Sequence, residues 1–227
     1  MLLRRRGFYY GVLVQANRAY YRHNEEQDSR LPHVARSRFE DLSGTVIGCD
    51  VSIEAGAVIG YNNIVVGGTC IRRGAKLKAN NYIEDCIIDE EAVLDSSHAV
   101  SSYVGKRATV GPYANLRAGN VIGDDCHIGD FVELKACNIG RGCKMGHLTY
   151  AGNVNMGEDC NVGAGVVFAN YDGKEKHSSI VGNRAFIGSS STIVAPSLSR
   201  TRRSSQPVRL LPETFRRARL RSAGQGR

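Results

Sequence analysis

Aliphatic residues recur at every sixth position from Ile47 to Ile193, with a few single-residue shifts. A period of six fits neither the 3.6-residue period of an α-helix nor the two-residue alternation of a long strand. It is the hexapeptide repeat of a β-helix, in which each unit supplies one short strand and a turn, and three units close a triangular coil. The repeated positions, which we expect to point inward, are Ile47, Ile53, Ile59, Val65, Ile71, Leu77, Ile83, Ile88, Leu94, Val100, Val104, Val110, Leu116, Ile122, Ile128, Leu134, Ile139, Met145, Met156, Val162, Phe168, Val181, Ile187 and Ile193.

A small or β-branched residue usually stands two positions before each inward residue, and glycine often follows it. Five cysteines share the small-residue position: Cys86, Cys126, Cys137, Cys143 and Cys160. A single unit cannot bury its inward side chains alone, so stacked coils must share one continuous core. The pattern therefore predicts an all-β fold, a parallel β-helix of about eight coils over residues 39–196.

The period is interrupted between Phe168 and Val181. Residues 170–177, with the sequence Asn-Tyr-Asp-Gly-Lys-Glu-Lys-His, must leave the coil as a projecting loop. Loops that project from a rigid scaffold often carry function. The alternative is a solvated insertion without a role.

The net charge of +8 comes from the two ends of the chain. Residues 1–38 hold eight Arg and three acidic residues, a net of +5, and residues 197–227 hold nine Arg and one acidic residue, a net of +8. The remaining residues, 39–196, therefore carry a net charge of −5. A nucleic-acid-binding protein needs a basic face on its folded part, and this body is acidic, so we expect no nucleic-acid partner.

The seven cysteines are odd in number and show no CxxC spacing. This argues against a disulfide framework and against a zinc site, and we expect no metal. Small buried cysteines are typical of proteins in a reducing cytoplasm, which is the expected location.

Neither end shows the repeat. We expect residues 1–38 to be poorly ordered; the apolar stretch 7–14 is too short to span a bilayer, although with Arg4–Arg6 before it the segment imitates a signal peptide. Residues 197–227 are rich in Arg and have two readings. In the first reading they form a basic disordered tail. In the second they are encoded by the gene of a longer repeat that is translated in a shifted reading frame, because codons can be chosen for this segment whose other frame encodes a continuation of the repeat.

His147 is a residue that the repeat does not explain. It is accompanied by Arg117, Lys135, Tyr150, Asn161, Asn170 and Lys176. Arg117 and Lys135 are 18 residues apart, which is one coil, so they should stack in neighbouring layers as a cationic pair suited to a phosphate. The alternative is a solvated basic stripe, in which Asp130 and Glu133 pair with these cations.

Five motifs carry a specific resemblance. They are Tyr113-Ala-Asn-Leu-Arg117, Gly129-Asp-Phe-Val-Glu-Leu-Lys135, Gly146-His-Leu-Thr-Tyr150, Asn161-Val-Gly-Ala-Gly165 and Asn170-Tyr-Asp-Gly173. In this order, over residues 40–196, the chain resembles the C-terminal left-handed β-helix domain of the bifunctional N-acetylglucosamine-1-phosphate uridyltransferase/glucosamine-1-phosphate acetyltransferase.

The resemblance implies a cytoplasmic homotrimer with active sites between subunits. It implies acetyl transfer from acetyl-CoA to the amine of glucosamine-1-phosphate, a step towards UDP-N-acetylglucosamine, peptidoglycan and lipopolysaccharide. It assigns His147 as the catalytic base. It assigns substrate contacts to Arg117, Lys135, Tyr150, Asn161 and Lys176, and acetyl-CoA contacts to Ala164, Asn170, Tyr171 and Ser189.

The chemistry suits these residue types. A sugar amine is largely protonated near neutral pH and must lose a proton to attack a thioester, and an imidazole titrates in the right range to take it. The backbone around Ala164 or the amide of Asn161 would stabilise the tetrahedral intermediate. No covalent enzyme intermediate is required, so no cysteine is needed as a nucleophile.

The sequence departs from the family in two respects. The uridyltransferase half has no counterpart, so we expect no uridyltransferase activity. The last coil, which holds part of the acetyl-CoA site, is replaced after Pro196 by the Arg-rich tail. Two alternatives follow: a weakly active or inactive β-helix that only trimerises, and another hexapeptide acyltransferase with a different acceptor.

Overall fold

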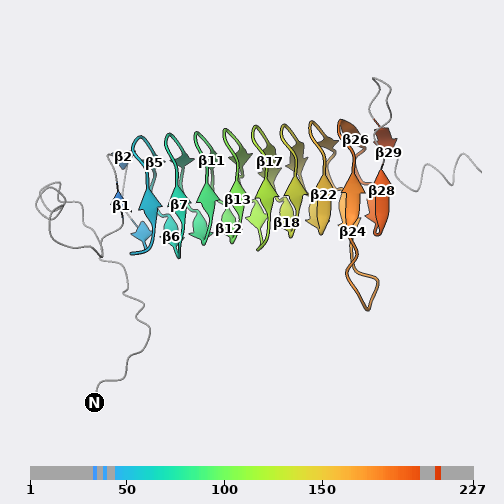
Figure 1. Ribbon diagram of the computed structural model, residues 1–227, viewed down its shortest axis with the longest axis horizontal. Coiled ribbons are helices and arrows are strands. Elements are labelled where there is room, and N and C mark those ends of the chain that lie inside the picture. Colours follow the sequence, from blue (N-terminus) through green and yellow to red (C-terminus); the bar gives the residue numbers. More distant parts are fainter. Residues whose placement is uncertain (1–32, 35–37, 40–43, 200–207, 211–227) are drawn as a thin grey trace, which may run out of the picture.

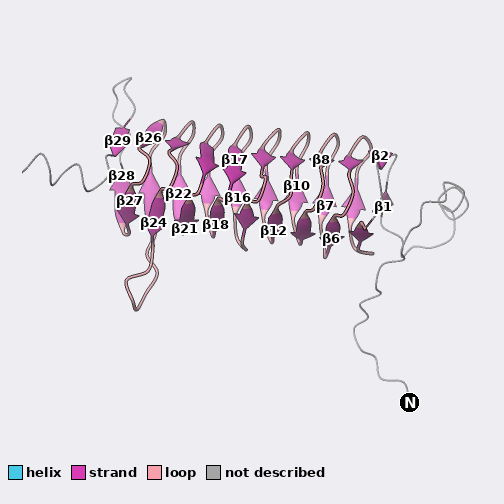
Figure 2. Ribbon diagram, turned by 180° about the vertical axis from the view of Figure 1, so that it is seen from behind, coloured by secondary structure: helices cyan, strands magenta, loops and turns pink. Residues whose placement is uncertain are grey.

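The computed structural model describes residues 33–34, 38–39, 44–199 and 208–210. These residues form a parallel β-helix whose short strands stack into three sheets, which we call A, B and C (Figure 1). The chain visits the sheets in turn, so each strand pairs in parallel with the strand three further along, as β10 does with β13. Figure 2 shows the same regular stack from behind.

The strands of each sheet follow one another along the solenoid. Sheet A contains β1 (His33–Val34), β4 (Ser52–Ile53), β7 (Cys70–Ile71), β10 (Ile87–Ile88), β13 (Tyr103–Val104), β16 (Val121–Ile122), β19 (Asn138–Ile139), β22 (Val154–Met156), β25 (Ser179–Val181) and β28 (Ser197–Ser199). Sheet B contains β2 (Arg38–Phe39), β5 (Val58–Ile59), β8 (Lys76–Leu77), β11 (Val93–Leu94), β14 (Thr109–Val110), β17 (His127–Asp130), β20 (Lys144–His147), β23 (Asn161–Val162), β26 (Ala185–Ile187) and β29 (Val208–Leu210). Sheet C contains β3 (Val46–Ile47), β6 (Ile64–Val66), β9 (Tyr82–Glu84), β12 (His98–Val100), β15 (Asn115–Leu116), β18 (Glu133–Lys135), β21 (Tyr150–Gly152), β24 (Val167–Ala169) and β27 (Thr192–Val194).

The core is the column of inward side chains that the six-residue period predicts. Most of the predicted aliphatic positions are buried, and Phe168 is the largest fully buried side chain. The five cysteines at the small-residue position are also buried, as expected.

One predicted inward position is wrong. Ala99, not Val100, is the buried residue of β12, and its partners in the sheet are Ile83 and Leu116. Both neighbouring intervals, from Leu94 to Ala99 and from Ala99 to Val104, are five residues long. Because strand residues alternate between the two faces, a shift of one position moves Val100 away from the core.

The predicted loop leaves the solenoid between β24 and β25, and both views show it as the longest excursion from the coils (Figures 1 and 2). Tyr171 and Lys176 form an antiparallel bridge within it.

The predicted segment boundaries at residues 39 and 196 remain predictions. Strand β1 lies before residue 39, and strands β28 and β29 lie after Pro196 and pair with β25 and β26. Arg38, in β2, is also described, and the other residues of the two predicted ends lie outside the described residues. No helix in the described part of the chain is long and apolar enough to cross a membrane.

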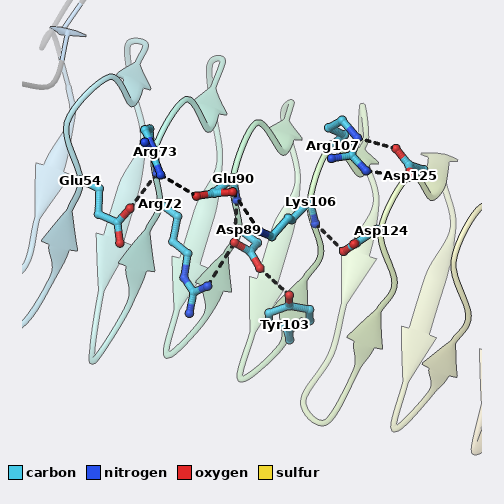
Figure 3. Close-up of polar contacts among 10 residues, drawn as sticks. All are labelled: Glu54, Arg72, Arg73, Asp89, Glu90, Tyr103, Lys106, Arg107, Asp124 and Asp125. Atoms are coloured by element: carbon cyan, nitrogen blue, oxygen red, sulfur yellow. Dashed lines mark hydrogen bonds and ion pairs between the residues drawn. The ribbon is translucent and has the colours of Figure 1, made fainter.

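The turns between sheets A and B carry charges whose sign alternates from one coil to the next. The rungs of this ladder are Glu54; Arg72 and Arg73; Asp89, Glu90 and Glu91; Lys106 and Arg107; Asp124 and Asp125; Arg141; Glu158 and Asp159; and Arg184. Figure 3 shows how neighbouring rungs pair. Glu90 accepts hydrogen bonds from Arg73 at 3.1 Å and from Lys106 at 2.9 Å, on either side of it.

Asp89 is the buried member of this ladder (Figure 3). Its carboxylate accepts hydrogen bonds from Arg72 at 3.2 Å and from the Tyr103 hydroxyl at 2.5 Å. The hydrogen bond to this carboxylate raises the pKa of Tyr103 to about 12. Opposite charges on adjacent coils thus support the register in which the coils stack.

Candidate active site

His147 ends strand β20, at the corner between sheets B and C, and is paired with Asp130. The two residues are register partners in neighbouring coils, and Nδ1 of His147 lies 2.5 Å from Oδ1 of Asp130. The imidazole holds the pKa of Asp130 below its usual range through this hydrogen bond. Because an ionised carboxylate only accepts hydrogen bonds, Nδ1 carries the hydrogen in this pair, and the neutral ring keeps a lone pair on Nε2. The ring is 62% exposed, so Nε2 is accessible to a substrate.

In the alternative reading of the sequence, Asp130 and Glu133 pair with the cations. Glu133 does so, with Oε1 3.0 Å from Nη1 of Arg117, but Asp130 pairs with His147 instead. The signal that identifies Asp130 is the local coil length. The interval from Leu134 to Ile139 is five residues, so the coil that separates Asp130 from His147 has 17 residues instead of 18.

Three cations from three separate segments gather on the sheet C side of this corner. Arg117 follows β15, Lys135 ends β18, and Lys176 lies in the projecting loop. The positive charges of Lys176 and Arg117 lower the pKa of Lys135, so the three lie close together. Glu133 is the carboxylate paired with this group in the described structure. Like charges held together in this way favour binding of an anion.

Tyr150 and Asn170 line the surface beside these cations. Tyr150 begins β21, and its hydroxyl donates a long hydrogen bond of 3.5 Å to Oδ1 of Asn170. Asn170 is buried, and its amide donates to Oδ1 of Asn153 at 2.8 Å. The backbone carbonyl of Asn170 accepts the backbone N–H of His177 at 2.7 Å, which closes the base of the loop. Asn170 therefore anchors the loop that presents Lys176.

The loop is braced by Asp172. Oδ1 of Asp172 accepts the backbone N–H groups of Lys174 and Glu175, each at 2.8 Å, and Oδ2 lies 2.7 Å from Nε2 of His177. These hydrogen bonds hold the pKa of Asp172 well below its usual range, and the bond from the backbone of Glu175 has the largest effect, followed by those from His177 and Lys174. Such an internal network orders a loop that the repeat itself does not hold.

Ala164 and Ser189 continue the column that contains His147. The backbone N–H of Gly165, next to Ala164, donates to the carbonyl of His147 at 3.3 Å, and Ser190, next to Ser189, donates to the carbonyl of Ala164 at 2.8 Å. Ala164 thus follows His147 by one coil, and Ser189 follows by two. Both side chains are small, which leaves space along the corner beyond the imidazole.

Of the two remaining predicted site residues, Asn161 lies on a different sheet from Lys135, whereas Tyr171 is bridged to Lys176 within the loop. Asn161 lies on sheet B, opposite Lys144 in the register, whereas Lys135 lies on sheet C. Tyr171 is 60% exposed, and its hydroxyl donates to the carbonyl of Gly173 within the loop.

The five cysteines at the small-residue position of the repeat are buried inside the solenoid, whereas Cys49 is exposed and Cys70 is half-buried. Burial raises the pKa of Cys86 to about 11, which keeps its thiol protonated and unreactive. The described residues contain no cluster of three or more His, Cys, Asp or Glu side chains arranged to hold a metal ion.

Comparison with known proteins shows which fold and which sequences this chain resembles. The crystal structure of a UDP-N-acetylglucosamine acyltransferase superposes with a TM-score of 0.53 at 13% identity, covering 71% of this chain and 70% of that one. This match shows the fold, a left-handed β-helix. In sequence, the bifunctional protein GlmU of Clostridium acetobutylicum is 44% identical over 156 residues, and that of Enterococcus faecalis is 48% identical over 153. The chain is a relative of the bifunctional GlmU proteins.

The matched regions cover 69% and 67% of this chain but only 34% and 32% of those two GlmU proteins, so the chain spans about a third of their length. This share is consistent with the resemblance of the five motifs to one domain of a bifunctional enzyme, and the resemblance is confirmed. No protein-family profile matches the chain.

Proposed function

We propose that the chain transfers an acetyl group from acetyl-CoA to the amine of glucosamine-1-phosphate. The observation that carries this proposal is the cationic group Arg117, Lys135 and Lys176 beside the accessible imidazole of His147. An anion-binding site next to a general base suits an acceptor that bears both a phosphate and an amine. The relation to the GlmU proteins supports the same acceptor.

His147 acts as the base in this proposal. As the amine attacks the thioester carbon, Nε2 takes the proton that the nitrogen loses. The tetrahedral intermediate then collapses, the C–S bond breaks, and the imidazolium returns the proton to the leaving CoA thiolate. The Asp130 carboxylate orients the ring through Nδ1 and stabilises the imidazolium. The products are an N-acetylated sugar phosphate and free CoA.

The remaining site residues would bind and position the two substrates. Arg117 and Lys135 would hold the acceptor phosphate, with Lys176 closing over it from the loop, and Tyr150 would bind the sugar. Asn161, or the backbone N–H groups beside Ala164, would donate to the oxyanion. Ala164, Asn170, Tyr171 and Ser189 would contact acetyl-CoA.

We infer that the active assembly is a cytoplasmic homotrimer. The observation that supports a partner is an apolar ridge on the corner next to His147, formed by Tyr113, Phe131 and Leu148, which are 61%, 58% and 61% exposed. The rings of Tyr113 and Phe131 stack 5.6 Å apart. All three residues adopt positive φ angles, which are rare for bulky side chains. A contiguous exposed apolar surface favours a protein interface, and a second chain there would complete the site.

The test is release of free CoA thiol from acetyl-CoA by the purified full chain, with glucosamine-1-phosphate as acceptor. A panel of other amines identifies a different acyl acceptor, and light scattering gives the mass of the assembly. Turnover specific for the phosphorylated amino sugar supports the proposal. An absence of turnover, together with a melting temperature that acetyl-CoA does not raise, supports the non-catalytic β-helix.

A further inference from the structure

The glycines that follow inward residues of the repeat have a clear steric role. A Cβ added to Gly60, Gly123 or Gly129 would lie 2.3, 2.7 or 2.1 Å from a backbone atom of the next coil. Carbon atoms do not approach backbone this closely, so the stacking of coils itself requires glycine at these positions.

Gly146 occupies the same place after Met145 but has no such role. A Cβ on Gly146 would meet no atom within 4 Å, and the backbone does not adopt a positive φ angle. Alanine would therefore fit this chain without strain. Glycine inside a strand, where it has no side chain to pack, often marks a place where a ligand or another backbone approaches closely.

The position of Gly146 indicates which ligand approaches. Gly146 precedes His147 in β20 of sheet B. The cations that would hold the acceptor phosphate lie beyond the corner, on sheet C and the loop. A direct transfer brings the acceptor amine and the acyl carbon together at the imidazole. With the acceptor anchored on the sheet C side, the sheet B side is left for the acyl group of the donor.

We propose that the bare surface of Gly146 receives the acyl group of the thioester donor and sets the size of acyl group that the site accepts. This inference rests on the proposed acetyl transfer. Lys144, outward on the same strand and in register with Asn161, marks the polar edge of this surface.

The experiment compares Gly146→Ala with the wild type, using acetyl-CoA and propionyl-CoA as donors and glucosamine-1-phosphate as acceptor. We expect Gly146→Ala to lower kcat/KM for both donors and to raise the acetyl-to-propionyl ratio by about 10-fold, the effect of one added methyl group in a fitted site. Melting temperature and oligomeric mass should stay at the wild-type values, because the added Cβ meets nothing in this chain.

Gly68→Ala is the matched control. A Cβ added at Gly68 would have its nearest neighbour, Oδ1 of Asp85, 3.8 Å away, and the φ angle of Gly68 is not positive, so this position also accepts alanine. Gly68 follows β6 of sheet C. Along that sheet, β6 is five strands away from β21, the strand of sheet C that comes directly after His147 in the chain. We expect Gly68→Ala to leave both kcat/KM and the donor ratio unchanged.

Calorimetry with acetyl-CoA separates failure of this inference from failure of the proposed function. If the wild type turns over and Gly146→Ala keeps its donor ratio, the inference is overturned while acetyl transfer stands. If Gly146→Ala changes the oligomeric mass, a second chain covers Gly146, and the inference is also overturned. If the wild type binds acetyl-CoA but does not turn over, weaker acetyl-CoA binding by Gly146→Ala, with unchanged binding by Gly68→Ala, still supports the inference. A wild type that binds no acetyl-CoA refutes both the inference and the proposed function.

Discussion

The pairing of His147 with Asp130 shows how the place of a residue in the coil decides which side chain it meets. Neither side chain is buried, and what joins them is the parallel register between β17 and β20. The sequence motifs predicted His147 as the base, because no structural need of the repeat explained it. They did not predict its partner, because a coil of 18 residues would have placed Gly129 opposite His147, and the shortened coil places Asp130 there.

Replacing Asp130 tests its proposed positioning role. Asp130→Asn keeps an oxygen near Nδ1 but removes the charge that stabilises the imidazolium. We expect kcat for acetyl transfer to fall by about 10-fold or more, with little change in KM for glucosamine-1-phosphate. Steady-state kinetics over both substrates gives this split. A rise in KM with an unchanged kcat would assign Asp130 to substrate binding instead.

The cationic group should cost stability when no anion is bound. The like charges of Lys176 and Arg117 lower the pKa of Lys135, so the charged form of Lys135 is disfavoured in the folded state. That penalty is fully present below the folded pKa of Lys135 and disappears as pH rises through its unfolded value. We therefore expect Lys176→Met to raise the melting temperature at pH 7 and to weaken binding of glucosamine-1-phosphate.

Differential scanning fluorimetry and calorimetry with glucosamine-1-phosphate measure these two effects. Lys174→Met, on the same loop, is the control and should change neither. The gain in melting temperature should shrink as pH approaches 10, near the ordinary pKa of lysine. A lower melting temperature for Lys176→Met, or unchanged affinity, would show that Lys176 does not belong to the anion site.

At the scale of elements, the repeat made most inward positions predictable because every unit uses them in the same way. Val100 was an error because both neighbouring intervals are short and alanine at position 99 gives a weak signal beside valine. The loop was predicted as an interruption, but its course was not. Its approach to Lys135 depends on Asp172 and Asn170, whose bonds lie outside the repeat.

The charge ladder between sheets A and B offers a test of register at this scale. Arg107 binds Asp125 through two hydrogen bonds, of 2.7 and 2.9 Å. Arg107→Asp places acidic rungs on adjacent coils, so we expect a lower melting temperature, with a smaller loss at high salt because ions screen exposed charges. The double variant Arg107→Asp/Asp125→Arg should recover part of the loss.

Thermal unfolding of Arg107→Asp, Asp125→Arg and the double variant, at low and at high salt, completes this double-mutant cycle. Additive losses, independent of salt, would mean that the alternating charges do not couple neighbouring coils.

For the whole molecule, the solenoid supplies a rigid frame, and the candidate active site lies at one corner of it. The frame was predictable because the same six-residue unit recurs along it. The site required a resemblance as well as the pattern, because Arg117, Lys135 and Lys176 come from two coils and a loop. The exposed ridge of Tyr113, Phe131 and Leu148 beside His147 suggests that the site is completed by a second copy, a feature that the period of one chain does not encode.

The most direct measurement is the rate of acetyl transfer from acetyl-CoA to glucosamine-1-phosphate by the wild type and by His147→Ala, followed by mass spectrometry of the sugar product. The exposed His147 side chain contributes little to the core, so the variant should fold with an unchanged melting temperature. We predict N-acetylglucosamine-1-phosphate from the wild type and a loss of at least about 100-fold in kcat for His147→Ala, which is the contribution typical of a general base. Equal rates from the two proteins, or no acetylated sugar from the wild type, would contradict the account.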